Sequence, residues 1–502
     1  MDPQSCVIGL DIGTTSVKAA AFDSAGRQLA LTAETLEQQR TESGAAEQDP
    51  HVVYAAVMAT LVRVAAQVRQ LGYRADQIGL SAAMHSLIPV GADDQPLAPA
   101  MLWMDTRAGD AADALWATPA GRDVYARTGT PIHAMAPLAK LLWMRAQRSE
   151  QFAAAARFVS LKEWVWYQWF AAWQIDTSLA SATGLYNLRQ GSWDAEALDI
   201  AGIGPERLSA LVPTTYVRHG LRDAQLLAAG LTLDTQWAIG ASDGVLANLG
   251  VGAIGSDLLV MTIGTSLAVR TGAPTPLTDP ATRPFCYVLD QDRYIVGGPS
   301  NSGGGVLDWL YRHILGGPAA HAEGPTFHTL ADLIAAAGEV ESEGLVCLPY
   351  AAGERAPLWN AHARGALFGL TLSHSRVHVM RAAIEGIIFN AYWIAARLFE
   401  QQGRPRELIA SGKVLEETWI RQLVADVFDL PVRSSGETDA SVTGAAWLAN
   451  LAAGVWSWED VARRAQLAHG PVTMPRDHAR AQEAYQRFQR LYQALAAEMS
   501  ER

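Results

Sequence analysis

Cysteine is scarce in this 502-residue chain. Its three cysteines, Cys6, Cys286 and Cys347, lie far apart in the sequence. This spacing excludes a disulfide framework and matches no pattern of metal ligands. A reducing compartment suits such a cysteine content, so we expect a cytoplasmic protein.

The chain also has no excess of positive charge. It carries 39 Lys and Arg residues against 51 Asp and Glu residues, a formal net charge of −12. This balance disfavours broad electrostatic attachment to nucleic acid or to an anionic membrane surface. We therefore expect no nucleic-acid partner and no membrane partner, and an anionic ligand must be bound by local donors.

Long uninterrupted apolar runs are missing as well. The most membrane-like stretch, residues 238–269, is broken by Asp243, Asp257 and six glycines, which favours buried strands and turns over a spanning helix. The N-terminus has no basic region before Cys6, so it is predicted to form a first strand and not a signal peptide. The absence of short-period repeats and low-complexity tracts disfavours solenoid, propeller and scaffold architectures.

Two common nucleotide-binding motifs are absent. The chain contains no G-x-x-x-x-G-K-[ST] phosphate loop, and it has no dinucleotide fingerprint in a strand–turn–helix context. The sequence therefore does not indicate a P-loop kinase or a dehydrogenase.

What the chain does contain is a pair of similar turns, half a chain apart. Residues 9–16 read G-L-D-I-G-T-T-S and residues 260–266 read V-M-T-I-G-T-S, so that Gly13 and Gly264 are 251 positions apart. In each copy an aliphatic run leads into glycine and hydroxyl residues, the composition of a strand–turn–strand whose backbone amides can approach a phosphate. One such turn is more often an ordinary hairpin. The pair predicts two related lobes that face one nucleotide.

The N-terminal part alternates strand and helix patterns. Strands are predicted over Val7–Asp11, over Ser16–Phe22 and from Arg27 onward, and a helix is predicted over Val53–Val68. A buried strand is expected at Gln77–Leu80. This alternation is typical of layered α/β folds.

Further elements follow from periodicity and composition. Helices are predicted over Leu330–Ala336, over Val379–Leu398 and along an apolar stripe over residues 481–495. Residues 271–284 and 315–329 are predicted to be loops.

The Trp-rich segment Glu163–Trp173 has two interpretations. It could stack on nucleic-acid bases, but its only neighbouring cation is Lys162. A buried amphipathic helix is therefore the favoured interpretation.

Asp243 is a candidate general base. It follows the predicted strand Gln236–Ile239 and has small neighbours, which leave a carboxylate open to a ligand. Phosphoryl transfer needs such a group within reach of the substrate hydroxyl. From the local sequence alone, an Asp that caps the next helix is the favoured alternative.

Three further features point to a nucleotide. Asp11 precedes the first turn, where a carboxylate could hold hydrated magnesium beside polyphosphate oxygens or simply form the turn. Lys18 could neutralise phosphate charge, although a surface lysine is the commoner case. The glycine-rich residues 297–305 precede a predicted helix over Val306–Ile314 and permit close backbone approach to a nucleotide.

Two segments resemble the signatures of the FGGY carbohydrate kinases. Residues 135–144, M-A-P-L-A-K-L-L-W-M, resemble the first signature, although Ala146 stands where a polar residue is usual. Residues 365–370, G-A-L-F-G-L, are followed at the expected spacing by His378 and by Ala382–Glu385, and they resemble the second signature throughout. The resemblance runs from about Val7 to about Ala449.

The resemblance implies an α/β, two-lobed actin/hexokinase-like ATPase fold (ribonuclease H-like) with an interdomain cleft. It implies an N-terminal lobe, residues 1–246, with the sugar site and the first phosphate turn. It implies a C-terminal lobe, residues 247–502, with the nucleotide site.

Within the family, several segments look most like gluconate kinases, with xylulose kinases as near neighbours: residues 81–87, 102–107, 180–185, 240–250 and 353–360. The implied reaction is ATP-dependent and magnesium-dependent phosphorylation of the terminal primary hydroxyl of D-gluconate to 6-phosphogluconate. A ketopentose such as D-xylulose, or another polyol, is the alternative acceptor.

The resemblance also implies roles for individual residues, and it reverses the preference for a capping role at Asp243. Asp243 becomes the catalytic base and, with Asp11, a metal ligand. The predicted substrate contacts are Met84, His85, Trp103, Asp105, Arg107, Lys162, Asp243 and Arg355, among which His85, Arg107, Lys162 and Arg355 are candidates for the gluconate carboxylate. The predicted nucleotide contacts are Gly13, Thr14, Thr15, Lys18, Gly264, Thr265, Ser266, Gly303, Gly304, Gly412, Lys413 and Glu416.

One turn departs from the family pattern. A Gly-Gly pair is usual on the adenine side, whereas here Gly412 is followed by Lys413, with Glu416 close by. This leaves nucleotide preference open, with a solvated Lys413 side chain as the favoured interpretation. An ATPase switch with a protein partner and a non-catalytic sugar sensor are remote alternatives, and homodimer formation stays open.

Overall fold

The computed structural model describes residues 3–41, 43–316, 327–436, 439–467 and 470–499. The chain divides into two compact units. The first unit is formed by Met1–Ile254, Ala273–Val296 and Asp439–Leu467, and the second by Gly255–Gly272, Gly297–Thr438 and Ala468–Arg502. Each unit is therefore discontinuous in sequence.

The first unit is built on a six-stranded sheet with the order β14-β15-β6-β1-β2-β3. Strand β1 is antiparallel to β2 and parallel to β6, and β6 is parallel to β15. The bounds are β1 (Gln4–Ile12), β2 (Ser16–Asp23), β3 (Gln28–Thr35), β6 (Tyr73–Ala82), β14 (Val217–Arg218) and β15 (Gln236–Ser242).

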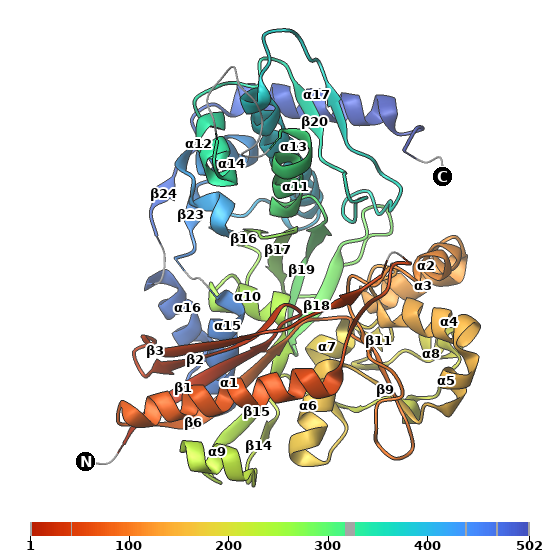
Figure 1. The fold of residues 1–502 in the computed structure, drawn as a ribbon, viewed down its shortest axis with the longest axis vertical. Helices are drawn as coiled ribbons and strands as arrows, with labels where there is room; N and C mark the ends of the chain where they lie inside the picture. The colour runs from red at the N-terminus through yellow and green to blue at the C-terminus, as the bar shows by residue number, and fades with distance from the viewer. Residues whose placement is uncertain (1–2, 42, 317–326, 437–438, 468–469, 500–502) are drawn as a thin grey trace. The chain divides into compact units, whose positions relative to one another are not determined.

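Helices cover both faces of this sheet because its strands are apolar on both sides. Helix α1 (Pro50–Gln70) lies along one face (Figure 1), where it packs near Ile8. Val7, the next residue along β1, points to the opposite face and packs with Val442 of α15 (Ala440–Ala452). At Gly79 in β6 a Cβ would come within 2.0 Å of the Ala445 carbonyl oxygen, so glycine lets α15 approach the sheet closely.

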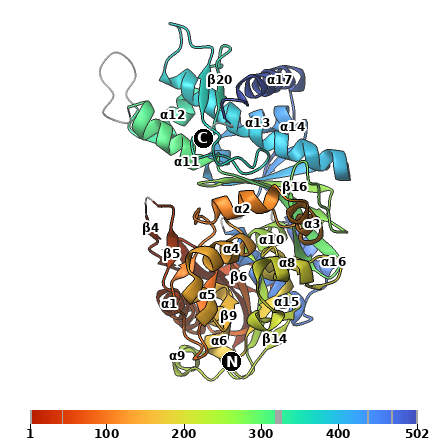
Figure 2. The same cartoon turned by 90° about the vertical axis from the view of Figure 1, so that its right-hand side faces the viewer.

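A helical layer of the first unit is seen in Figure 2, and its apolar side chains form a separate cluster. It contains α2 (Gly109–Trp116), α3 (Pro119–Thr128), α4 (Pro137–Gln147), α5 (Ser149–Ala154) and α8 (Ala195–Ala201). The other elements of this unit are β4 (Gln39–Arg40), β5 (Ala46–Gln48), β7 (Ile88–Val90), β8 (Ala100–Met101), β9 (Arg157–Val159), α6 (Leu161–Phe170), β10 (Gln174–Asp176), α7 (Thr177–Ser181), β11 (Tyr186–Asn187), β12 (Ser192–Trp193), η1 (Pro205–Arg207), β13 (Ala210–Val212), α9 (Ala224–Ala229), α10 (Asp243–Gly250), β18 (Phe285–Asp290) and α16 (Trp458–Leu467).

Six consecutive strands of the seven-stranded second sheet, in the order β19-β17-β16-β22-β23-β24, repeat the plan of the first sheet. Strand β16 is antiparallel to β17 and parallel to β22, β22 is parallel to β23, and the edge strand β24 is antiparallel to β23. The bounds are β16 (Leu258–Ile263), β17 (Leu267–Ala273), β19 (Arg293–Ser300), α11 (Gly304–Trp309), a π-helical turn η2 (Leu310–Ile314), α12 (Leu330–Ala337), β20 (Val346–Leu348), β21 (Ala366–Phe368), α13 (Arg376–Gln402), β22 (Glu407–Ser411), η4 (Lys413–Glu416), α14 (Thr418–Phe428), β23 (Val432–Ser434), β24 (Val472–Thr473) and α17 (His478–Leu495).

The predicted elements are mostly confirmed. The first three strands, the strand at β6, and the helices α1, α12, α13 and α17 all form where the sequence predicts them. The Trp-rich segment forms the buried helix α6, which ends at Phe170 and not at Trp173. Residues 317–326 of the predicted loop 315–329 lie outside the described residues.

Two predictions of irregular structure are partly wrong. Strand β17 runs to Ala273, so the loop predicted from residue 271 begins later. Residues 297–300 belong to strand β19 and not to a glycine-rich turn. At Gly298 a Cβ would come within 2.6 Å of an Ile394 side-chain atom, so glycine here serves the packing of α13 on a strand.

In the part of the chain that the structure describes, two helices are long and apolar enough to be membrane-span candidates, α1 and α13. In α13, 83% of the most apolar window is buried inside the protein. The buried residues of α1, including Val53, Val57 and Leu61, pack on the first sheet. Packing therefore accounts for the apolar character of both helices. Residues 238–269 form strands, turns and the short helix α10.

Candidate active site

Asp11 lies at the end of β1, where it is held by two hydroxyl groups. Ser81 Oγ on β6 donates to Asp11 Oδ1 at 2.6 Å, and Ser441 Oγ on α15 donates to Oδ2 at 3.1 Å. Burial raises the pKa of Asp11, while these two hydrogen bonds lower it. Nearby, Lys18 is paired with Asp439. The close approach of α15 to the sheet thus brings residues from the two ends of the chain to the first turn.

The turn between β1 and β2 is accessible but held in place. The Gly13 N–H donates to the Ser16 carbonyl at 3.1 Å, and the Thr14 carbonyl accepts from the side chains of Gln38 and Gln48 at 2.9 and 2.8 Å. Thr15 is exposed. The hydroxyl groups of this turn are therefore available to a ligand on a fixed backbone.

The residues near this turn fit magnesium that arrives with a nucleotide. In phosphoryl-transfer sites magnesium is held by one or two carboxylates together with substrate phosphates and water. Asp11 and Asp243 are two carboxylates of the first unit. Among residues 3–499 that the structure describes, no three His, Cys, Asp or Glu side chains gather as a metal cage. The donors suit a substrate-associated ion and not an all-protein metal centre.

Asp243 is the first residue of α10, directly after β15. Ser242 occupies the N-cap position, and Asp243 Oδ1 accepts from the Gly244 N–H at 2.7 Å. The N-cap position is therefore Ser242, one residue before Asp243, whereas the side chain that accepts from an N–H of the first helical turn is that of Asp243. Asp243 is partly exposed, as a proton acceptor for a ligand must be.

A bulge in β15 sets the direction of the chain before Asp243. The register between β15 and β6 shifts between Ala238 and Ala241, where Gly240 has φ +75° and a Cβ would come within 1.7 Å of the Leu80 carbonyl oxygen. After the bulge, Ser178 Oγ accepts from the Ser242 N–H at 3.2 Å. These contacts fix the backbone that carries Asp243.

Lys162 contributes to the same support. It is 2% exposed, and its Nζ donates to Asp176 Oδ2 at 2.8 Å and to the Ala241 carbonyl at 3.1 Å. Asp176 in turn caps α7 by accepting from the Leu179 N–H. Burial lowers the pKa of Lys162, whereas Asp176 raises it, and Asp11 is close enough to raise it as well. Lys162 thus links α7 and the end of β15.

His85 lies on the loop after β6 in a left-handed conformation, with φ +69°. Its Nδ1 is 2.8 Å from the Ala182 carbonyl and its Nε2 is 3.5 Å from the Tyr287 hydroxyl. A proton on Nδ1 satisfies the carbonyl and leaves Nε2 as an acceptor. Met84 beside it is partly buried. Tyr287 is a neighbour that the sequence did not single out.

Arg107 and Asp105 form a second polar group of the first unit. The Arg107 guanidinium donates to both Asp105 oxygens, at distances from 2.5 to 3.1 Å, and to Glu47 Oε1 at 2.5 Å. Asp105 is 1% exposed, and its Oδ2 also accepts from the Ala46 N–H. The Arg107 side chain is 14% exposed. Trp103, two residues before Asp105, is partly exposed.

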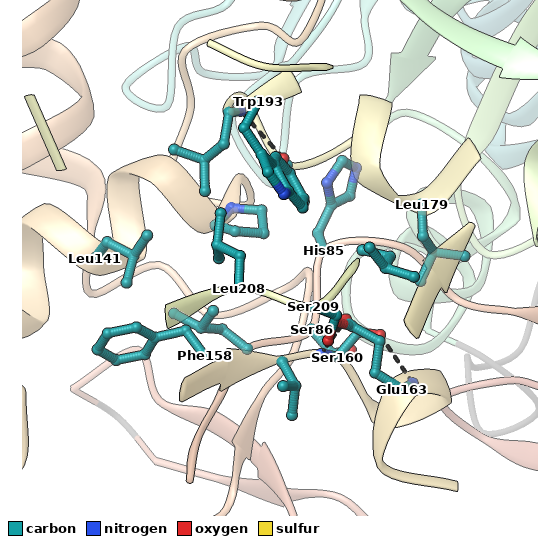
Figure 3. A pocket seen from close by; sticks show the side chains of 16 residues that line it. His85, Ser86, Leu141, Phe158, Ser160, Glu163, Leu179, Trp193, Leu208 and Ser209 are labelled. Atoms are coloured by element: carbon teal, nitrogen blue, oxygen red, sulfur yellow. Dashed lines mark hydrogen bonds between the residues drawn. The ribbon is translucent and has the colours of Figure 1, made fainter. Parts of the chain in front are cut away.

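A small cavity lies behind the His85 loop (Figure 3). Its volume of about 20 Å³ holds one water molecule and excludes a sugar. Leu141, Phe158 and Leu208 line its apolar side, and Ser86, Ser160, Glu163 and Ser209 line its polar side. Burial raises the pKa of Glu163 to about 7. The cavity is therefore part of the support of the loop and not the sugar site.

In the second unit, the turn between β16 and β17 carries Gly264, Thr265 and Ser266. The Gly264 N–H donates to the Ser266 carbonyl, and the Gly304 N–H donates back to the Gly264 carbonyl at 2.8 Å. At Gly303 a Cβ would come within 2.6 Å of Ser266 backbone. A hydrogen bond thus attaches the N-terminal turn of α11 to the turn between β16 and β17. The Gly304 N–H is therefore occupied by the protein and is not available to a nucleotide.

Gly412 follows β22 with φ +113°, and a Cβ there would come within 2.1 Å of the Ile263 carbonyl oxygen. Lys413 and Glu416 on η4 are exposed. Glycine at 412 is therefore required by the packing of β22 on β16, whereas the residue at 413 is not constrained in this way.

Arg355 also belongs to the second unit. Its Nε donates to Asn301 Oδ1 at 2.8 Å and its Nη2 donates to the Ser300 carbonyl at 3.2 Å. The adjacent Glu354 is 1% exposed and accepts from the hydroxyl groups of Ser300 and Ser302. All other predicted sugar contacts lie in the first unit.

Comparisons with known proteins agree with this arrangement. Residues 6–250 match the N-terminal domain and residues 259–453 match the C-terminal domain of the FGGY family of carbohydrate kinases. A gluconokinase of Bacillus subtilis is 40% identical over 454 residues, which cover 90% of this chain and 88% of that protein.

Two solved structures are equally similar. A gluconate kinase from Lactobacillus acidophilus has a TM-score of 0.91 and 34% identity over 98% of both chains. A ligand-bound xylulose kinase from the same organism has the same TM-score and identity over 98% of this chain and 99% of that chain. The predicted α/β fold of sugar kinases and actin-like ATPases is confirmed. This chain belongs to the FGGY family of carbohydrate kinases.

Proposed function

We propose that this carbohydrate kinase phosphorylates the terminal primary hydroxyl of D-gluconate with ATP to give 6-phosphogluconate and ADP. The observation that carries the proposal is the 40% identity, over 90% of this chain, to a gluconokinase. The tertiary structure does not separate gluconate from xylulose, because a gluconate kinase and a xylulose kinase match it equally well.

In the proposed reaction Asp243 accepts the proton of the substrate hydroxyl. The hydroxyl oxygen forms a bond to the γ-phosphorus, and the bond from that phosphorus to the bridging oxygen breaks and releases ADP. The position of Asp243 after the Gly240 bulge, partly exposed and braced through Ser242 and Lys162, supports this role. Magnesium, when bound with the nucleotide at Asp11 and Asp243, would neutralise charge on the phosphates.

The turns at Gly13 and Gly264 are the proposed phosphate contacts, and Gly412 and Lys413 are proposed contacts on the adenine side. The exposed Thr15 and the fixed backbone of the first turn support this assignment. A lobe boundary at residues 246/247, a cytoplasmic location and a homodimer are further parts of the proposal.

Gluconate differs from neutral ketoses by its carboxylate, and Arg107 is the proposed partner of that group. Lys162 is nearly inaccessible and is already bonded to Asp176 and Ala241. In Arg107, Nε and Nη2 are bonded to Asp105 and Glu47, whereas Nη1 has no acceptor among the described residues. This third guanidinium nitrogen suits a charge-assisted hydrogen bond to a substrate carboxylate.

An ADP-release assay with Mg-ATP tests the proposal. We expect D-gluconate to be preferred over D-xylulose, D-ribulose, L-ribulose and glycerol, with little release when no sugar is present. Faster turnover of xylulose would instead establish the ketopentose alternative, which the equal match to a xylulose kinase structure supports.

A further inference from the structure

Lys140 is a buried cation of helix α4 that none of the proposed steps uses. Its side chain is completely buried, at 0% exposure. Its Nζ lies 2.5 Å from the carbonyl oxygen of His85, 2.7 Å from that of Leu102 and 3.4 Å from that of Met101. The side chain therefore joins α4 to two separate backbone segments.

The surroundings of Lys140 define its chemistry. An ammonium group has three protons, and three carbonyl oxygens converge on it, which favours the charged form. Burial acts in the opposite direction and lowers the pKa of Lys140 to about 7, with Asp105 raising it and Arg107 lowering it further. The Leu102 and Met101 carbonyls also accept from the N–H groups of Asp105 and Leu87, so loss of the ammonium removes one donor from each carbonyl and with it the link from α4 to the two segments.

Lysine is rare in this chain, and its four positions are informative. Among 39 Lys and Arg residues, lysine occurs only at positions 18, 140, 162 and 413. Lys140 and Lys162 are both fully buried and both donate to backbone carbonyls. A compact ammonium can bond to converging carbonyls, whereas a planar guanidinium needs more space and a different geometry.

The two segments that Lys140 joins carry most of the proposed sugar contacts. One is the loop with Met84 and His85, where His85 has a left-handed backbone that costs free energy for a residue with a side chain. The other begins at Leu102 and continues to Trp103, Asp105 and Arg107. By bonding to the His85 and Leu102 carbonyls, one side chain fixes the separation of the two segments.

We propose that Lys140 is a positioning residue for the sugar site, which sets the backbone of the His85 and Leu102 segments so that their side chains can bind the acceptor. It acts through these segments and does not itself touch the substrate. The proposal rests on the proposed location of the sugar site, but not on which sugar is bound.

The test compares Lys140→Met, Lys140→Gln and the control Met144→Ala with the wild type. Met144 is buried one turn further along the same helix, in the apolar cluster of the helical layer, so its variant reports a loss of packing in α4. For each protein we would measure kcat, the KM for the acceptor that the wild type prefers, the KM for Mg-ATP and the melting temperature. Hydrogen exchange would be followed in peptides that cover residues 82–87 and 100–107.

We expect Lys140→Met to raise the acceptor KM by roughly tenfold or more, since the His85 and Leu102 carbonyls lose the ammonium that joins them, while the KM for Mg-ATP stays within about twofold. Lys140→Gln retains an N–H donor and should recover part of the acceptor affinity. Faster exchange is expected in both segments for Lys140→Met but not for Met144→Ala.

Three results would overturn the proposal: equal rises in both KM values, the same kinetic change in Met144→Ala, or unchanged exchange in both segments. If the wild type prefers another sugar over gluconate, the proposed function is wrong. The comparison of the Lys140 and Met144 variants still stands, because each KM is measured for the acceptor that the wild type prefers. If Lys140→Met does not fold, the KM values and the hydrogen exchange of Lys140→Gln test the proposal in its place.

Discussion

At the residue scale, three cations of the first unit meet oxygen atoms in different ways. Arg107 contacts two carboxylates, Lys162 contacts one carboxylate and one carbonyl, and Lys140 contacts carbonyls. The Arg107 side chain is 14% exposed, whereas those of Lys140 and Lys162 are 0% and 2% exposed. The three cations are therefore expected to respond differently to substitution.

Replacement of Asp243 by Asn tests the general base. The amide keeps the size of the side chain but cannot accept the hydroxyl proton, so kcat is expected to fall by about 10²–10⁴-fold. ATP binding, measured by calorimetry, should be nearly unchanged. Near-normal turnover of the variant would remove Asp243 from the mechanism.

Replacement of Arg107 by Met tests recognition of the carboxylate. The gluconate KM is expected to rise by roughly tenfold or more, because a charge-assisted hydrogen bond is lost. The xylulose KM should rise less, since that sugar has no carboxylate. Equal rises for the two sugars would mean that Arg107 acts only by holding Asp105 and Glu47.

At the element scale, the bulge in β15 is expected to control where Asp243 lies. Gly240→Ala adds a Cβ that would come within 1.7 Å of the Leu80 carbonyl oxygen at φ +75°. Gly220 has a similar φ of +80° with nothing within 4 Å of an added Cβ, so Gly220→Ala measures the conformational cost alone. That cost is about 1–2 kcal/mol.

We expect Gly240→Ala to lower kcat by at least about tenfold, as misplacement of a catalytic group by 1 Å can cost more than this. Gly220→Ala should change stability only. If both variants retain full turnover, the bulge does not position the base.

The N-terminal capping box of α6 gives a pH dependence of stability. Glu163 accepts from the Ser160 N–H at 2.6 Å, and burial raises its pKa from 4.5 to about 7 in the folded state. The folded protein therefore binds more protons than the unfolded chain between these values, so the stability from this group is present below about pH 4.5 and is lost as pH rises through 7.

In the Glu163→Gln variant the side chain cannot titrate, and its amide offers an oxygen as hydrogen-bond acceptor and an NH₂ group as donor. Relative to this variant, the wild type should lose on the order of 2–3 kcal/mol of unfolding free energy between pH 5 and pH 8. Urea denaturation at four pH values would measure the difference. A difference that does not vary with pH would show that Glu163 does not titrate in this range.

At the scale of the whole molecule, the first unit depends on a distant part of the chain. Helix α15 buries Val442, Ala446 and Ala449 against its sheet, and Ser441 bonds to Asp11. A fragment of residues 1–254 lacks this helix and would expose an apolar sheet face. We therefore expect the fragment to show weak near-UV circular dichroism and to aggregate, whereas a cooperative melting transition would contradict this prediction.

The sequence by itself determined the local elements and the family. Periodicity predicted α1, α13 and α17, since the apolar residues of each helix recur on one side. The two turns at half-chain spacing predicted the repeated plan, which the matching strand orders of the two sheets confirm. The signature segments determined the family because each motif is contiguous in the chain.

Only the tertiary structure decided how distant residues meet. No local pattern connects Ser441 with Asp11, 430 residues apart, or Lys140 with the His85 carbonyl, 55 residues apart. Nor does a local pattern distinguish Ser242 from Asp243 as the helix cap, or assign Lys162 to the support of β15. The physical reason is that spacing along the chain records strands, helices and turns, whereas these partners are chosen by the packing of α4, α6 and α15 on elements remote in sequence.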